Sequence, residues 1–237
     1  MSGTLYLIPT QLGDIPWPTV MPTATQETAC RLRHFVVENA KSARASLKWL
    51  GHPGPLRELG IEELPESPAP ADLDRLLAPL LAGHDLGVMS EAGCPGVADP
   101  GALLVRRAHA QGITVKPLVG PSSLLLALMA SGLDGQRFAF HGYLPQRDPE
   151  RSKRILELEK ESHQKRQTQI FIETPYRNGA LLDALLAACR PDTRLCLATD
   201  LTLPGESVVT RTVAEWRRAV SVDFSKRPTV FLLLSAD

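Results

Sequence analysis

Short apolar runs alternate with turn-rich loops and helical segments along this chain of 237 residues. Runs of this length predict buried strands, and the helical periodicity between them predicts connecting helices. Such an alternation favours an α/β fold built on open sheets. The predicted strands are Thr4–Ile8, His34–Glu38, Ile61–Leu64, Leu86–Met89, Ile113–Leu118, Arg137–His141, Gln169–Ile172, Leu195–Ala198, Ser207–Thr210 and Thr229–Leu234.

The alternation occurs twice, which predicts two open α/β domains side by side. We place the N-terminal domain at residues 1–118 and the C-terminal domain at residues 119–237. The segment Leu124–Ala130 is nearly all apolar, so we expect this helix to be buried. Ligands of open α/β sheets bind beyond the carboxyl ends of the strands, and the predicted site is therefore a cleft between the two domains.

Composition excludes several classes of protein. Lys+Arg 26 against Asp+Glu 26 leaves no net charge, which counts mildly against an autonomous nucleic-acid binder because phosphate neutralisation dominates such affinity. The four cysteines form no CxxC pair, so neither a metal site nor a disulfide framework is expected. No stretch approaches the roughly 20 apolar residues of a membrane span, and no secretory signal is visible. We therefore expect a cytoplasmic protein.

The loop from Ser90 to Gly101 follows a predicted strand and precedes a helix. Its glycines allow a ligand to approach the backbone, and its prolines restrict the backbone conformation of the loop. Asp99 and Pro100 have the form of an N-cap followed by proline at the first helical position. A cysteine in a glycine-rich loop is typical of enzymes that form phosphocysteine, in which an arginine binds the phosphate. Here no arginine follows Cys94 until Arg106, so a small residue that fills a tight turn is the better interpretation. A strand-to-helix connection without any ligand remains the alternative.

Several familiar chemistries lack their motifs. The sequence contains no GxxxxGK[ST] phosphate loop, no GxGxxG after a strand, no HExxH and no GxSxG. What remains is a set of loops rich in Gly, Pro, Ser and Thr with little charge, which suits a ligand held through backbone groups. S-adenosylmethionine is such a ligand because it carries no phosphate. This pattern is suggestive and does not by itself identify the cofactor.

Six motifs in order resemble loops of the tetrapyrrole methylase superfamily, in its ribosomal RNA small subunit methyltransferase I branch. The family patterns are PTPIGN, SDAGTP…DPG, PLPGPSA, GFLP, ESPHR and LTK…E. Any one motif is weak, but six in order over nearly the whole chain are specific. The matching segments are Pro9–Asp14, Ser90–Gly101, Pro117–Ser122, Gly142–Pro145, Glu173–Arg177 and Leu201–Glu206.

The resemblance implies a class III methyltransferase that uses S-adenosylmethionine and forms a homodimer. In this branch the reaction is 2′-O-methylation of a cytidine in small-subunit rRNA, so the 30S subunit or its rRNA is the implied partner. Carried over by motif, the implied cofactor-binding residues are Pro9, Gly13, Ser90, Glu91, Ala92, Gly93, Cys94, Pro95, Val97, Ala98, Ser122, Ser123, Ile172, Glu173, Thr174, Pro228 and Thr229.

A ribose hydroxyl is a poor nucleophile and needs a base or close alignment. Glu38 and Glu173 are the candidate catalytic residues because each lies at the end of a predicted strand, although each is equally suited to brace a loop. Tyr176 is suited to stacking on a base or to packing on a helix. Three hypotheses remain open: an rRNA ribose methyltransferase, a methyltransferase of a tetrapyrrole or other small molecule, and a non-catalytic protein that binds S-adenosylmethionine.

Overall fold

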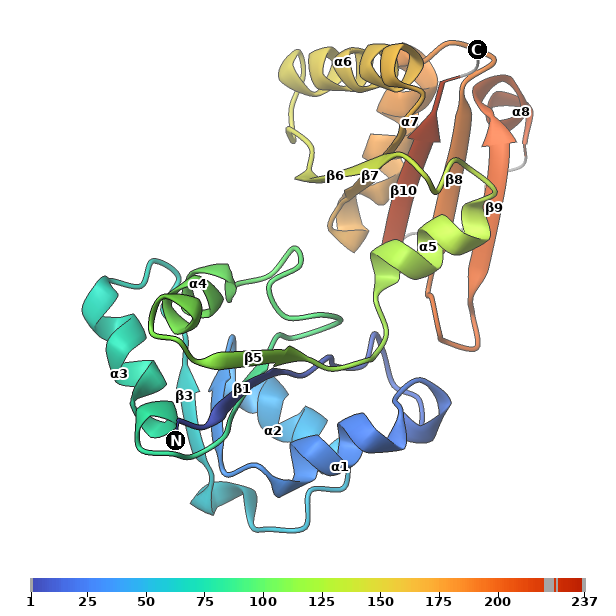
Figure 1. Ribbon diagram of the computed structural model, residues 1–237. Helices are drawn as coiled ribbons and strands as arrows, with labels where there is room; N and C mark the ends of the chain where they lie inside the picture. Colours follow the sequence, from blue (N-terminus) through green and yellow to red (C-terminus); the bar gives the residue numbers. More distant parts are fainter. Residues whose placement is uncertain (1, 220–223, 225, 236–237) are drawn as a thin grey trace. The chain divides into compact units, whose positions relative to one another are not determined.

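The computed structural model describes residues 2–219, 224 and 226–235. Contacts between Cα atoms divide the chain into two compact units, Met1–Ser122 and Ser123–Asp237. The boundary between them falls just before the helix that follows Ser122, a few residues beyond the expected junction at Leu118. Each unit contains one five-stranded sheet with helices packed on it (Figure 1). The expected fold class, two open α/β domains, is confirmed.

The first sheet has the strand order β3-β2-β4-β1-β5, and all of its strands are parallel. Leu5, on an inner strand, pairs with Leu86 on one side and with Val115 on the other. The strands are β1 (Thr4–Leu7), β2 (His34–Val37), β3 (Gly60–Glu63), β4 (Leu86–Met89) and β5 (Thr114–Pro117). The helices are η1 (Trp17–Thr19), α1 (Thr23–Arg31), α2 (Ala40–Trp49), η2 (Leu56–Glu58), α3 (Pro70–Leu81) and α4 (Ala102–Ala110).

Helices cover both faces of the first sheet, α1 and α2 on one face and α3 and α4 on the other (Figure 1). Successive residues of a strand point to opposite faces, which explains why neighbours in the sequence belong to different cores. Phe35 and Val37 pack with α1 and α2, whereas Val36 packs with α3 and α4. A parallel sheet covered on both faces directs its ligand site to the strand ends.

The second sheet has the order β6-β7-β10-β8-β9 and is mixed: β6 and β7 are parallel, and the remaining neighbours are antiparallel. Its strands are β6 (Phe138–Tyr143), β7 (Thr168–Ile172), β8 (Arg194–Thr199), β9 (Ser207–Thr212) and β10 (Thr229–Leu234). Its helices are α5 (Ser123–Ser131), α6 (Glu150–Lys165), η3 (Pro175–Arg177), α7 (Asn178–Ala188) and α8 (Val213–Arg218). All ten predicted strands are present.

One face of the second sheet is covered by α6, α7 and α8 around a stacked pair of rings, Phe171 and Phe231. The helix α5 packs on β8, β9 and β10. The expectation that this helix is buried is wrong for Leu125 and Met129, which are 53% and 80% exposed. Its uniformly apolar sequence concealed which face packs on the sheet, because no polar residue marks the outer side.

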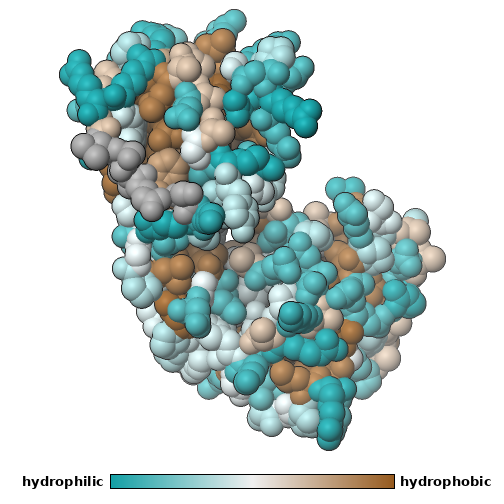
Figure 2. All heavy atoms as spheres, turned by 180° about the vertical axis from the view of Figure 1, so that it is seen from behind, coloured by the Kyte–Doolittle hydropathy of each residue, from teal (hydrophilic) through white to brown (hydrophobic). Residues whose placement is uncertain are grey.

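The surface is otherwise ordinary for a globular protein. On the face seen in Figure 2, hydrophilic residues predominate and hydrophobic ones lie in small interspersed groups. Within the described residues, no helix combines the length and apolar character that crossing a membrane requires.

Candidate functional site

The loops that follow β1 and β4 are joined at the carboxyl edge of the first sheet. The amide of Thr10 donates to the carbonyl oxygen of Gly93 at 2.9 Å, and the amide of Gly93 donates back to Thr10 at 3.3 Å. The hydroxyl of Thr10 also donates to the carbonyl oxygen of Ser90. Gly93 has a φ of +73°, which side chains rarely tolerate. A glycine is therefore required where these two loops meet.

The loop after β5 closes against the same pair. A Cβ atom added at Gly120 would lie 2.4 Å from Cβ of Pro9, so the two backbones are as close as glycine allows. The thiol of Cys94 lies 3.5 Å from the carbonyl oxygen of Pro121. Burial, with the charge of Asp99, raises the pKa of this thiol, so Cys94 is held as a neutral thiol. Cys94 thus fills a turn where three loops converge.

Three carboxylates surround this junction. The side chain of Glu38, which follows β2, accepts a hydrogen bond at Oε2 from the amide of Glu91 at 3.2 Å. Burial and the nearby charge of Glu38 raise the pKa of Asp99 to about 6, Glu91 adds to this shift, and a hydrogen bond from Ser90 opposes it. An acid whose pKa approaches neutrality in a strand-end loop is a candidate for proton transfer.

The expected N-cap at Asp99 is wrong. The helix α4 begins at Ala102 and its N-cap is Gly101, whose φ of +133° only glycine adopts readily. The carboxylate of Asp99 is engaged by the hydroxyl of Ser90 instead of by the helix. Asp99 was therefore absent from the expected site residues, although the match of Asp99–Gly101 to the family's DPG motif offered a signal.

The second unit brings its own expected site residues together. Ile172 pairs with Val230 across β7 and β10, which places the segment after β7 beside the start of β10. The hydroxyls of Thr229 and Thr199 lie 3.1 Å apart, and the carbonyl oxygen of Pro228 accepts the amide of Asp200 at 2.9 Å. Ile172, Thr174, Pro228 and Thr229 therefore occupy one edge of the second sheet.

Glu173 is buried at this edge. Its Oε1 atom accepts hydrogen bonds from Nε and Nη2 of Arg177 at 3.0 and 2.7 Å and from the amide of Thr174 at 2.6 Å. The hydrogen bond to Glu173 raises the pKa of Arg177, with the charge of Glu173 acting in the same direction. The geometry is that of a carboxylate that braces the turn η3.

The remaining expected residues lie at the margins of these loops. Gly13 is half-buried in the loop after β1, and Ser122 and Ser123 stand at the entrance of α5. Val97 is 47% exposed, and Ala98 has a positive φ of 65° on the outer turn of its loop. The amide of Val97 donates to the carbonyl oxygen of Cys94 at 3.1 Å, within the loop after β4.

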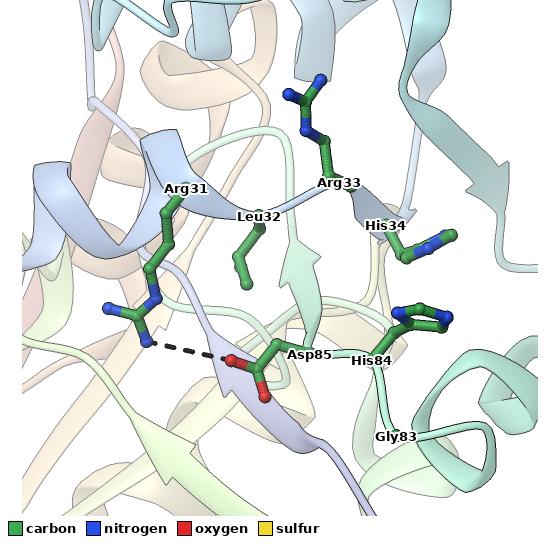
Figure 3. Close-up of a pocket in the computed structure, with 7 residues that line it drawn as sticks. All are labelled: Arg31, Leu32, Arg33, His34, Gly83, His84 and Asp85. Atoms are coloured by element: carbon green, nitrogen blue, oxygen red, sulfur yellow. Dashed lines mark ion pairs between the residues drawn. The ribbon is translucent and has the colours of Figure 1, made fainter.

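A pocket of about 310 Å³ lies at the opposite, amino edge of the first sheet (Figure 3). It is set between the end of α1, the start of β2 and the turn before β4. Arg31 points toward Asp85 across a distance of 4.0 Å, and the rings of His34 and His84 lie side by side with centroids 5.3 Å apart. Because it opens at the amino ends of the strands, it is separate from the loop junction. Its lining residues are Arg31, Leu32, Arg33, His34, Gly83, His84 and Asp85.

The fold resembles solved methyltransferases. The crystal structure of the methyltransferase CobJ superposes with a TM-score of 0.62 at 16% identity, covering 100% of this chain and 95% of that one. Diphthine synthase superposes with a TM-score of 0.64 at 15% identity, covering 99% and 90%. At these identities the likeness establishes the fold alone.

Curated relatives are more similar in sequence. The ribosomal RNA small subunit methyltransferase I of Xylella fastidiosa is 33% identical over 98% of this chain and 81% of its own length. Proteins of the same name from Neisseria meningitidis and Pseudomonas aeruginosa are 31% and 30% identical, over 94% and 95% of this chain and 72% and 76% of their own lengths. Residues 56–216 match the family described as Tetrapyrrole (Corrin/Porphyrin) Methylases. The chain belongs to the tetrapyrrole methylase family.

Proposed function

We propose that this protein transfers a methyl group from S-adenosylmethionine to a ribose 2′-hydroxyl of small-subunit ribosomal RNA. The observation that carries the proposal is the junction of acidic strand-end loops, in a chain that is 33% identical to a ribosomal RNA small subunit methyltransferase I over almost its whole length. Conversely, the zero net charge favours a small-molecule substrate such as a tetrapyrrole, which the experiment below includes.

The residues present fit this cofactor. The loops at 9–16, 90–101 and 118–122 contain no lysine or arginine, so they lack the cations that clamp phosphates. Glu38, Glu91 and Asp99 place negative charge where an ammonium or sulfonium cation is stabilised. Gly93 and Gly120 add no side chain of their own to the junction, where the apolar side chains of Pro9 and Leu12 and the neutral thiol of Cys94 pack. These loops, which carry carboxylates and no lysine or arginine, therefore suit a cationic ligand without phosphate.

Backbone groups around Gly93, with Pro9, Ser90 and Ser122, would hold the cofactor on the first unit. On the second unit, Ile172–Thr174 and Thr229 are the cofactor-binding residues that the family resemblance implies. When bound, S-adenosylmethionine supplies an electrophilic methyl carbon for in-line displacement. We assign Asp99 as the acceptor of the hydroxyl proton, because its pKa of about 6 leaves it ionised yet basic near neutrality. Glu38 tunes this basicity through its charge and fixes the loop through the amide of Glu91.

The first test is calorimetry with S-adenosylmethionine, followed by methyl transfer from labelled cofactor to unmethylated 30S subunits and to a tetrapyrrole. We expect micromolar binding and label in 16S rRNA at a ribose, detected as resistance of one linkage to alkaline hydrolysis. Label in the tetrapyrrole alone would mean that the substrate is a small molecule and not rRNA. Cofactor binding without methyl transfer to the 30S subunit or to the tetrapyrrole would indicate a non-catalytic protein.

We further propose that the protein is a cytoplasmic homodimer, in keeping with its family resemblance and with an rRNA substrate. Light scattering after size-exclusion chromatography at micromolar concentration tests this assembly. A mass of 25.8 kDa, that of one chain, would contradict it.

Glu173 is assigned to bracing rather than to proton transfer. We expect Glu173→Gln to lower kcat less than about tenfold, since the loss of a general base usually costs 10²- to 10⁴-fold. Arg177→Ala should reproduce this effect, and the double variant should add little, because both changes remove one ion pair. A loss of kcat above about 100-fold that only Glu173→Gln shows would identify Glu173 as a catalytic residue.

A further inference from the structure

Two of the three tyrosines of this chain are strongly exposed on the second unit. Tyr176 is 81% exposed and Tyr143 is 60% exposed, whereas Tyr6 is buried at 8%. Aromatic residues make up only 5% of the sequence, and these two are among the few that the fold leaves exposed. The exposure of Tyr176 contradicts packing against a neighbouring helix as its role.

The turn that carries Tyr176 is held rigidly. The amide of Arg177 donates to the carbonyl oxygen of Thr174 at 2.9 Å, and the amide of Lys226 donates to that of Pro175 at 3.2 Å. Asn178, which is fully buried, donates from Nδ2 to the carbonyl oxygen of Arg227 at 2.8 Å. A ring carried on so constrained a turn is partly preorganised to meet a ligand, because little backbone freedom remains to be lost.

The two tyrosines lie on adjoining strand ends. Tyr143 is the last residue of β6 and pairs with Ile172, four residues before Tyr176. The hydrogen bond to Glu173 contributes most to raising the pKa of the Arg177 guanidinium. A charge interaction with Tyr143 acts in the same direction. Lys226 is exposed beside the same turn. Aromatic faces and cations thus share one edge of the second sheet.

We propose that Tyr176 and Tyr143, with Arg177 and Lys226, form a platform on which an unpaired base of single-stranded RNA stacks. Aromatic rings and guanidinium planes stack on splayed bases, and adjacent cations attract the phosphates that join them. The platform adjoins Glu173 and Thr174, two residues that the family resemblance assigns to cofactor binding. The inference rests on the proposed function for its choice of RNA as ligand.

The test is fluorescence anisotropy with a labelled, unstructured single-stranded oligoribonucleotide and with a duplex of the same sequence. We expect Tyr176→Ala to weaken binding of the single strand about 5- to 100-fold, the range for loss of one stacked base, and Tyr143→Ala to weaken it similarly. Tyr176→Phe should stay within about twofold because it keeps the ring. Phe138→Ala, at the far end of β6, is the matched control and should leave the affinity unchanged. Circular dichroism confirms that each variant is folded.

The outcomes separate this inference from the proposed function. Unchanged RNA affinity in both tyrosine variants overturns the platform, whether or not the protein methylates 30S subunits. Equal weakening by Tyr176→Phe and Tyr176→Ala also overturns stacking, because a hydroxyl contact would then explain the loss. Loss of single-strand binding in the alanine variants supports the platform even if the 30S subunit is not methylated, in which case only the proposed substrate fails.

Discussion

A Gly93→Val variant is expected to bind S-adenosylmethionine about 5- to 100-fold more weakly than the parent, the loss that corresponds to the roughly 1–3 kcal/mol that strained backbone costs. Gly93 has a φ of +73° and exchanges two hydrogen bonds with Thr10, which joins the loops after β1 and β4. A β-branched residue forced into this conformation shifts the backbone and breaks that exchange. Calorimetry with the cofactor measures the effect.

The Gly112→Val variant is the matched control. Gly112 has a φ of +68° and no atom within 4 Å of an added Cβ, and it lies in the turn between α4 and β5, at the other edge of the sheet. The same substitution therefore imposes similar strain away from the loop junction. If both variants lose cofactor affinity equally, general destabilisation explains the result; if Gly93→Val binds normally, the assignment of this loop to the cofactor fails.

Strands were more predictable than the packing of helices. The inner strands are short apolar runs bounded by turn residues, and this local signal persists because the sheets bury most of their residues; these strands are β1, β2, β4, β7, β8 and β10. The exposed face of α5 was missed because SLLLALMAS has no polar side to orient it. The sequence also did not predict that β10 lies antiparallel between β7 and β8, because strand order depends on contacts between distant segments.

The sequence predicted Gly93 as a cofactor residue because glycine in a strand-end loop permits close approach to a ligand. Ser90 came from the likeness of its loop to the family's SDAG motif, and both assignments stay predictions. Asp99 was interpreted as a helix cap because Asp-Pro is a local signal for a helix start, and that signal competes with tertiary partners. Only the fold shows that Glu38, distant in sequence, brings its charge to Asp99. The bracing of Glu173 by Arg177 likewise required side-chain geometry.

An Asp99→Asn variant is expected to lower kcat by about 10²- to 10⁴-fold, the usual contribution of a general base, while cofactor affinity changes much less. Asparagine preserves the shape of the side chain and its hydrogen bond with Ser90 but cannot accept the hydroxyl proton. Single-turnover methyl transfer to 30S subunits separates this step from binding. Asp183→Asn, an exposed residue of α7, is the control for loss of one negative charge. An activity within about tenfold of the parent would exclude Asp99 as the base.

The same substitution should stabilise the fold, with a dependence on pH that identifies the cause. Burial and the charge of Glu38 raise the pKa of Asp99 from 3.8 to about 6, so the folded state favours the protonated acid. The parent is therefore most favoured below pH 3.8 and loses stability as the pH rises through about 6. Because the group is only half-buried, solvent screening reduces the expected gain of Asp99→Asn at pH 8 to about 1 kcal/mol.

Denaturant unfolding at pH 4 and pH 8 measures this difference in the free energy of unfolding. We expect the stabilisation by Asp99→Asn to appear at pH 8 and to vanish near pH 4, where the parent carries a neutral Asp99 as well. An equal gain in the free energy of unfolding at pH 4 and at pH 8 would show that packing, and not charge, causes the stabilisation. A variant that is more stable yet inactive would show that the protein keeps a strained carboxylate for its chemistry, because a residue selected for stability alone would not be placed beside Glu38.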